Sequence, residues 1–133
     1  MINIEGLDSM KILLMDDDEE YSKITKMYLE SNGFNVDICT DPIKGLEMCK
    51  ENKYSILLLD YYMGAMDAED FLDQLREFDK KLVVILQTGY SDRKIPLKTL
   101  VTMDIQGYYD KTKNIEELLL TLISTIKTMK MFL

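Results

Sequence analysis

The chain has 133 residues, of which 47% are apolar, enough for one domain with a core of its own. Its 16 Lys and Arg residues against 24 Asp and Glu residues give a formal charge of −8. That charge argues against direct binding to nucleic acid or an anionic membrane, because phosphate groups select basic surfaces. The absence of histidine excludes histidine-based triads, metal sites and acid–base catalysis.

The first predicted strand, residues 11–15, is an apolar run that leads into acidic residues. A helix follows, and the apolar residues that recur at the helical period predict its inner face: Tyr21, Ile24, Met27 and Tyr28. Asn32 and Gly33 should end this helix, since glycine suits the left-handed conformation that closes helices. Residues 34–40 alternate apolar and polar, as a half-buried strand does.

Asp41 and Pro42 are typical of a helix start, as the cap and the first helical residue. Residues 55–60, with the sequence SILLLD, predict a buried strand that ends on Asp60. Asp67 can cap the helix after that strand, and the inner face of this helix is predicted to be Ala68, Phe71, Leu72, Leu75 and Phe78.

The second half repeats the alternation, with strands at residues 82–88 and 107–110 and a short helix from Pro96 to about Met103. The last helix has one broad apolar face, formed by Ile115, Leu118, Leu119, Leu122, Ile123 and Ile126. Mostly apolar strands separated by amphipathic helices predict an α/β fold with a parallel sheet covered on both faces. The alternating strand, residues 34–40, should lie at an edge of this sheet.

Polar or charged side chains follow four of the five predicted strands. Asp16, Asp17 and Asp18 follow the first strand, and Asp60, Thr88 and Lys111 stand at the ends of the third, fourth and fifth. In an open parallel sheet, sites form beyond the carboxyl ends of the strands, so these side chains can converge.

Clustered carboxylates repel one another, and a divalent cation relieves the repulsion; an all-oxygen site suits Mg²⁺. An ionised aspartate beside such a cation could attack phosphorus, while Lys111 and the Thr88 hydroxyl neutralise phosphoryl oxygens. The simpler interpretation is that Asp16 and Asp17 are solvated acids at the start of a helix, and we assign that role to Asp18.

Four stretches in order, LLMDDDEEY, LLLDYYMGAMDAEDF, VVILQTGYSD and GYYDKT, resemble the receiver domain of bacterial two-component response regulators. The resemblance implies a flavodoxin-like (βα)5 doubly wound sandwich with strand order 2-1-3-4-5. It implies that Asp60 is the phosphoacceptor. Asp17 would bind Mg²⁺ directly and Asp16 through water, with the backbone carbonyl of Tyr62 as a further ligand. Lys111 and Thr88 would contact the phosphoryl group, and Tyr108 would be the switch aromatic that responds to Thr88.

The resemblance also implies a phosphorylation-switched signalling module rather than an enzyme. The phosphoryl group would come from a partner histidine kinase or phosphotransfer protein, and the last strands and helices could form a homodimer. We expect residues 1–10 to be a lead-in and residues 11–131 to be a single receiver domain, with no output domain visible. Cys39 and Cys49 form no C-x-x-C pair, no run reaches the ~18 apolar residues of a membrane span, and no signal peptide is evident. We therefore expect a cytoplasmic location.

Three positions depart from the family pattern: Gly64 stands where proline is frequent, Ala68 where glycine is frequent, and Thr112 where a cis proline is usual. A cis bond before a non-proline residue costs ~2.5–4 kcal/mol, so the bond before Thr112 should be trans. Tyr62 and Tyr90 each lie two residues past a key group, and we hypothesise that their rings slow hydrolysis of the phospho-aspartate. The alternatives are a phosphorylation-independent scaffold and a haloacid-dehalogenase-like phosphatase with Asp18 as its acid.

Overall fold

The computed structural model describes residues 10–89 and 95–131. Five parallel strands form one sheet in the order β2-β1-β3-β4-β5, which confirms the expected order. The strands are β1 (Lys11–Met15), β2 (Asn35–Cys39), β3 (Ile56–Asp60), β4 (Val83–Thr88) and β5 (Gly107–Asp110). The helices are α1 (Glu19–Ser31), α2 (Pro42–Glu51), α3 (Ala68–Phe78), α4 (Leu97–Thr102) and α5 (Ile115–Met131). The alternating strand β2 lies at an edge, as predicted.

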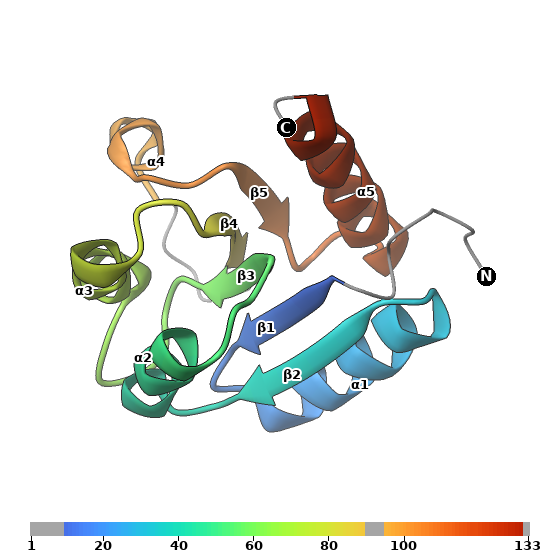
Figure 1. Ribbon diagram of the computed structural model, residues 1–133, viewed down its shortest axis with the longest axis horizontal. Helices are drawn as coiled ribbons and strands as arrows, with labels where there is room; N and C mark the ends of the chain where they lie inside the picture. The colour runs from blue at the N-terminus through green and yellow to red at the C-terminus, as the bar shows by residue number, and fades with distance from the viewer. Residues whose placement is uncertain (1–9, 90–94, 132–133) are drawn as a thin grey trace.

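The helices cover both faces of the sheet, with α1 and α5 on one side and α2, α3 and α4 on the other (Figure 1). Successive strand residues point to opposite faces, so β1, β2, β3 and β4 each contribute to two hydrophobic clusters, one on each face of the sheet. On β3, Leu57 and Leu59 pack toward α2 and α3, whereas Ile56 and Leu58 pack toward α1 and α5. All five residues of β3 are buried, which explains its unbroken apolar run.

Local signals in the sequence set the helix starts. The Asp41 carboxylate accepts a hydrogen bond from the Ile43 backbone N–H, with Pro42 in the first turn, as predicted. Asp67 accepts from the Asp70 backbone N–H and caps α3, also as predicted. A side-chain oxygen at the cap satisfies a backbone donor that the helix itself leaves unpaired.

The predicted inner face of α1 is wrong at Ile24 and Met27, whereas Tyr21 and Tyr28 are half-buried and Tyr28 packs against the core. Ile24 is 57% and Met27 is 72% exposed, and the residues that α1 buries are Ser22, Thr25 and Leu29. Small hydroxylated side chains allow the helix to approach the sheet closely, and the Ser22 hydroxyl is satisfied because it donates to the Asp18 carbonyl oxygen. The apolar periodicity therefore combined inward and outward residues, because it considered hydrophobicity alone and gave no weight to small residues such as Ser22 and Thr25.

Two further expectations concern residues near the ends of helices and strands. Phe78 was predicted to face inward, but it is the last residue of α3 and is 38% exposed, with the Lys50 ammonium over its ring. The described residues contain no cis peptide, so the bond before Thr112 is trans, as expected. Among the described residues, no helix is both long enough and apolar enough to cross a membrane.

Candidate functional site

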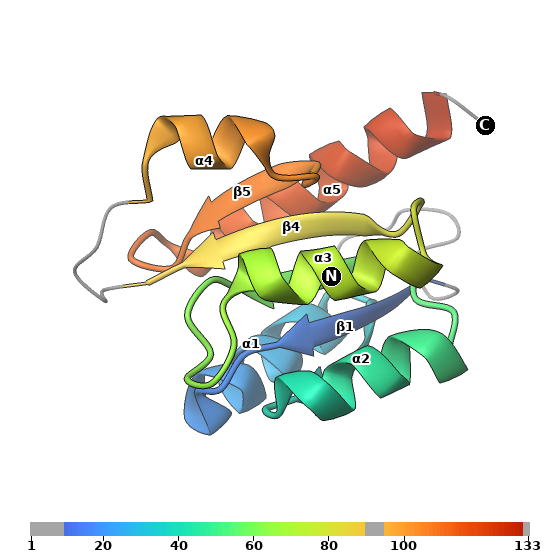
Figure 2. The same cartoon turned by 90° about the vertical axis from the view of Figure 1, so that its left-hand side faces the viewer.

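The carboxyl ends of the strands point to one edge of the sheet, where the arrowheads of β1, β4 and β5 lie on the same side of the molecule (Figure 2). Asp16 follows β1 directly, Asp60 ends β3 and Thr88 ends β4. Lys111 follows β5 and is anchored by its backbone N–H, which donates to the Thr88 carbonyl oxygen at 2.7 Å. The sheet thus gathers side chains that lie far apart in the sequence.

Asp16, Asp17 and Asp60 form a carboxylate cluster in which one oxygen of each lies within 4.8 Å of the others. Asp16 is fully buried and Asp60 is 6% exposed, whereas Asp17 faces solvent. The Asp16 carboxylate accepts a hydrogen bond from the Asp18 backbone N–H, which fixes its orientation. Two buried carboxylates and one exposed carboxylate leave the cluster open on one side.

Lys111 balances part of this charge. Its ammonium nitrogen lies 2.8 Å from an Asp16 carboxylate oxygen and 3.4 Å from an Asp60 oxygen. Burial by itself would lower the pKa of Lys111, but the hydrogen bond to Asp16 and the charges of both carboxylates outweigh it and raise the pKa. The lysine therefore stays charged and spans the two buried acids.

The folded protein disfavours the ionised form of the Asp60 carboxyl. Burial raises the pKa of Asp60 to about 7, the Asp16 charge adds to this rise, and Lys111 opposes it. One ammonium does not neutralise three clustered carboxylates, and a hard divalent cation bound by oxygen ligands would complete the balance. The donor set, its spacing and its open side fit Mg²⁺.

Thr88 and Tyr108 meet beside this cluster. Their hydroxyl oxygens are 2.7 Å apart, within hydrogen-bond distance, across the pair of neighbouring strands β4 and β5. Tyr108 is 46% exposed, so its ring lies at the surface. The two residues to which the resemblance gives the switch role are thus in direct contact.

The loop after β3 holds the predicted carbonyl ligand and two of the departures. Tyr62 is 37% exposed and forms an isolated bridge with Asp67. Gly64 has φ of +73°, a conformation that proline cannot adopt because its ring fixes φ near −65°. Ala68 is fully buried, and its backbone N–H donates to the Tyr61 carbonyl oxygen. Tyr90 lies outside the described residues.

The sequence did not indicate that Tyr21 lies next to Lys111, or that Gln87 binds the Tyr21 hydroxyl. The ring centroid of Tyr21 lies 4.3 Å from the Lys111 ammonium, and the Tyr21 hydroxyl donates to the Gln87 side-chain oxygen at 2.8 Å. Burial raises the pKa of Tyr21, so its hydroxyl stays neutral. A fully buried glutamine in an apolar strand was the available signal, because a buried amide needs a polar partner.

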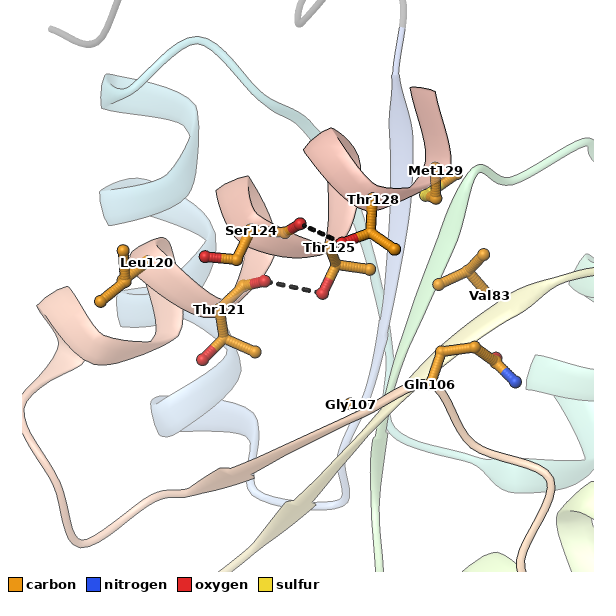
Figure 3. Close-up of a pocket in the computed structure, with 9 residues that line it drawn as sticks. All are labelled: Val83, Gln106, Gly107, Leu120, Thr121, Ser124, Thr125, Thr128 and Met129. Carbon is orange, nitrogen blue, oxygen red and sulfur yellow. Dashed lines mark hydrogen bonds between the residues drawn. The ribbon is translucent and has the colours of Figure 1, made fainter. Parts of the chain in front are cut away.

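A second hollow lies away from this cluster, between α5 and the starts of β4 and β5 (Figure 3). The hydroxyls of Thr125 and Thr128 donate to backbone carbonyl oxygens one turn earlier, so they are satisfied within α5. No titratable side chain lines this hollow among the described residues. This hollow therefore lacks the acidic and basic groups that the carboxylate cluster has.

Comparison with known proteins finds relatives that cover most of the chain. The profile of the response regulator receiver domain matches residues 12–123. The chain is 31% identical over 123 residues to a probable transcriptional regulator, ycf29, of Porphyra purpurea, covering 91% of this chain and 56% of that protein. It is 33% identical over 109 residues to an uncharacterized transcriptional regulatory protein, YkoG, of Bacillus subtilis (strain 168), covering 81% of this chain and 47% of that protein. The chain thus spans about half the length of these curated relatives.

Solved structures agree on the fold. A CheY-like receiver domain protein from Methanospirillum hungatei JF-1 superposes with a TM-score of 0.81 at 23% identity, covering 91% of this chain and 96% of that one. The receiver domain of the Francisella response regulator 1452 gives a TM-score of 0.78 at 23% identity, covering 90% and 98%. These likenesses confirm the flavodoxin-like fold, and together with the profile match they show that the chain belongs to the response regulator receiver domain family.

Proposed function

We propose that this chain is a phosphorylation-switched signalling receiver in which Asp60 accepts a phosphoryl group from a histidine kinase or phosphotransfer protein in the cytoplasm. The observation that carries the proposal is the buried Asp60 carboxylate, which shares one cluster with Asp16 and Asp17 and lies 3.4 Å from the Lys111 ammonium. The proposal takes residues 11–131 as a single receiver domain.

In the proposed reaction an oxygen of the Asp60 carboxylate attacks phosphorus, and an O–P bond forms as the P–N bond to the donor imidazole breaks. The imidazole keeps the electron pair and takes a proton, and the product is an acyl phosphate on Asp60. Bound Mg²⁺ would supply the positive charge that keeps Asp60 ionised and offsets the phosphoryl charge. Asp17, Asp16 through water, Asp60 and the Tyr62 carbonyl oxygen would hold it.

The remaining residues position the transferred group. Lys111 can pair with one phosphoryl oxygen, since its ammonium already lies beside Asp60, and the Thr88 hydroxyl can donate to another. A Thr88 hydroxyl turned toward phosphate gives up its hydrogen bond to Tyr108. The half-exposed Tyr108 ring is then free to change position, and this rearrangement is the proposed switch.

The surface that responds would be the face formed by the last strands and helices. Exposed apolar side chains lie on α4, where Leu97 is 75% and Val101 is 73% exposed, and on α5, where Leu120 is 64% exposed. Exposed apolar residues that form a patch are typical of an interaction surface. We propose that this face forms a homodimer or binds another protein when Asp60 is phosphorylated.

The phosphatase alternative has less support. Its general acid would be Asp18, but the Asp18 carboxylate accepts a hydrogen bond from the Tyr21 backbone N–H and caps α1. We propose instead that the chain catalyses only phosphorylation and dephosphorylation of its own Asp60. A receiver should not turn over phosphate monoesters, and a phosphorylation-independent scaffold should not become labelled at all.

The test is the intact mass of the protein after incubation with acetyl phosphate and Mg²⁺. The wild-type protein should gain one phosphoryl group and Asp60→Asn should gain none. Asp67→Asn is the matched control, because it changes an aspartate of the same loop while asparagine still caps α3, and it should be labelled like wild type. Labelling of Asp60→Asn, or no labelling of any of the three, would contradict the proposal.

A further inference from the structure

Tyr21 contacts the Lys111 ammonium, and the proposed reaction gives this ring no role. It lies in the first turn of α1, and its ring centroid is 4.3 Å from the Lys111 ammonium. A cation at this distance from the face of an aromatic ring is attracted by the negative charge that the ring carries on its face. Lys111 therefore has three partners: two carboxylates and one neutral ring.

The ring is held in place from its far end. The Tyr21 hydroxyl donates to the side-chain oxygen of Gln87 at 2.8 Å, and Gln87 is fully buried in β4, directly paired with Asp60 in the sheet. Because Gln87 is fully buried, the hydrogen bond to its side-chain oxygen limits the freedom of the ring to turn away from Lys111. The hydrogen bond between α1 and β4 thus sets the position of the ring relative to the Lys111 ammonium.

The two kinds of partner differ in what a metal ion does to them. Mg²⁺ binds carboxylate oxygens, so it competes with the Lys111 ammonium for Asp16 and Asp60 and also repels it. The neutral Tyr21 ring does not compete for the hard cation and continues to attract the ammonium. A lysine held by carboxylates alone would move away as the metal binds, whereas a lysine held also by the ring would stay.

We propose that Tyr21 is a positioning residue that keeps the Lys111 ammonium over the site when Mg²⁺ occupies the carboxylates, ready to pair with a phosphoryl oxygen. The proposal rests on the function proposed above for the role of Lys111. Its geometric part, the retention of Lys111 over the ring in the presence of Mg²⁺, stands independently of phosphorylation.

The test compares Tyr21→Phe with Tyr21→Leu. Both variants lack the hydroxyl and leave Gln87 equally unpaired, so they differ in the ring alone. The first readout is the proton chemical shift of the Lys111 ε-methylene group, followed by NMR as Mg²⁺ is added. Protons over a ring face resonate upfield, so the shift should stay upfield at saturating Mg²⁺ in wild type and Tyr21→Phe and be absent in Tyr21→Leu. Movement of the wild-type resonance to its free-lysine position on metal binding would overturn the proposal.

The second readout is the rate of labelling by acetyl phosphate at saturating Mg²⁺, together with Mg²⁺ affinity by calorimetry. Tyr21→Leu should be labelled about 5- to 30-fold more slowly than Tyr21→Phe, without weaker Mg²⁺ binding, because the lost attraction acts on the lysine and not on the carboxylates. Equal rates for the two variants, or a parallel loss of metal binding and labelling in Tyr21→Leu, would overturn it. If the wild-type protein is not labelled at all, the proposed function fails, and the NMR result alone decides the position of Lys111.

Discussion

Replacing Asp60 by asparagine should stabilise the protein in the absence of divalent cations. Burial and the Asp16 charge raise the pKa of Asp60 to about 7, far above the value of 3.8 that describes the unfolded chain. A raised pKa means that the folded protein binds the proton more tightly than the unfolded chain does, so stability falls as pH rises between these two values. Asparagine keeps the shape of the protonated carboxyl and removes this pH dependence.

The size of the effect follows from the pKa difference. A shift of about three units, at ~1.4 kcal/mol per unit, sets an upper limit of ~4 kcal/mol for the cost of ionising Asp60 in the folded protein. Asparagine loses the attraction to Lys111, but the lysine keeps its 2.8 Å ion pair with Asp16. We therefore expect Asp60→Asn to unfold with a free energy ~2–4 kcal/mol larger than that of wild type near pH 8. The difference should approach zero below about pH 4, where both folded forms carry a neutral group at this position.

The assay is urea unfolding of both proteins in EDTA at a series of pH values, followed by circular dichroism. Asp67→Asn is the control, because Asp67 lies in the same loop but is only half-buried and asparagine can still cap α3. Its free energy of unfolding should stay within ~0.5 kcal/mol of wild type. Two results would refute the claim that ionised Asp60 destabilises the fold. One is a lower free energy of unfolding for Asp60→Asn than for wild type at pH 8, and the other is a difference between the two proteins that does not shrink in acid.

Four further outcomes are expected. Mg²⁺ should raise the urea midpoint of wild type, and Asp17→Asn should lose most of this stabilisation, because ligand binding stabilises only the form that has the complete site. Arg76→Ala should lower the free energy of unfolding by ~2–4 kcal/mol in urea titrations, since the largely buried guanidinium donates to three backbone carbonyl oxygens. Gly45→Ala should cost ~1–3 kcal/mol in the same titrations, because a methyl group there would overlap the Met15 side chain. Tyr62→Ala should speed decay of the labelled protein several-fold if its half-exposed ring excludes water; an unchanged half-life would remove that role.

The sequence predicted the features that depend on local patterns. The caps Asp41 and Asp67 could be predicted because an aspartate directly before a helical pattern can accept a hydrogen bond from an unpaired backbone N–H of the first turn. The edge position of β2 followed from its alternation, and the carboxylate cluster from the rule that strand ends share one edge of a parallel sheet.

Features that depend on how elements pack were not predictable in this way. The predicted inner face of α1 was wrong at Ile24 and Met27, because the helix buries Ser22 and Thr25 in their place, and this depends on how closely the helix approaches the sheet. The contact between Tyr21 and Lys111 joins the first helix to the residue after the last strand, so no local pattern contains it.

The most direct measurement of the central claim is to locate the phosphoryl group by chemical trapping. Borohydride reduces an acyl phosphate on aspartate to homoserine, which peptide sequencing by mass spectrometry can place. After acetyl phosphate and Mg²⁺, the proposed function predicts homoserine at position 60, with Asp16 and Asp17 unchanged, and none when EDTA replaces Mg²⁺. Homoserine at either of the other two positions of the cluster, or labelling at position 60 that persists in EDTA, would contradict it.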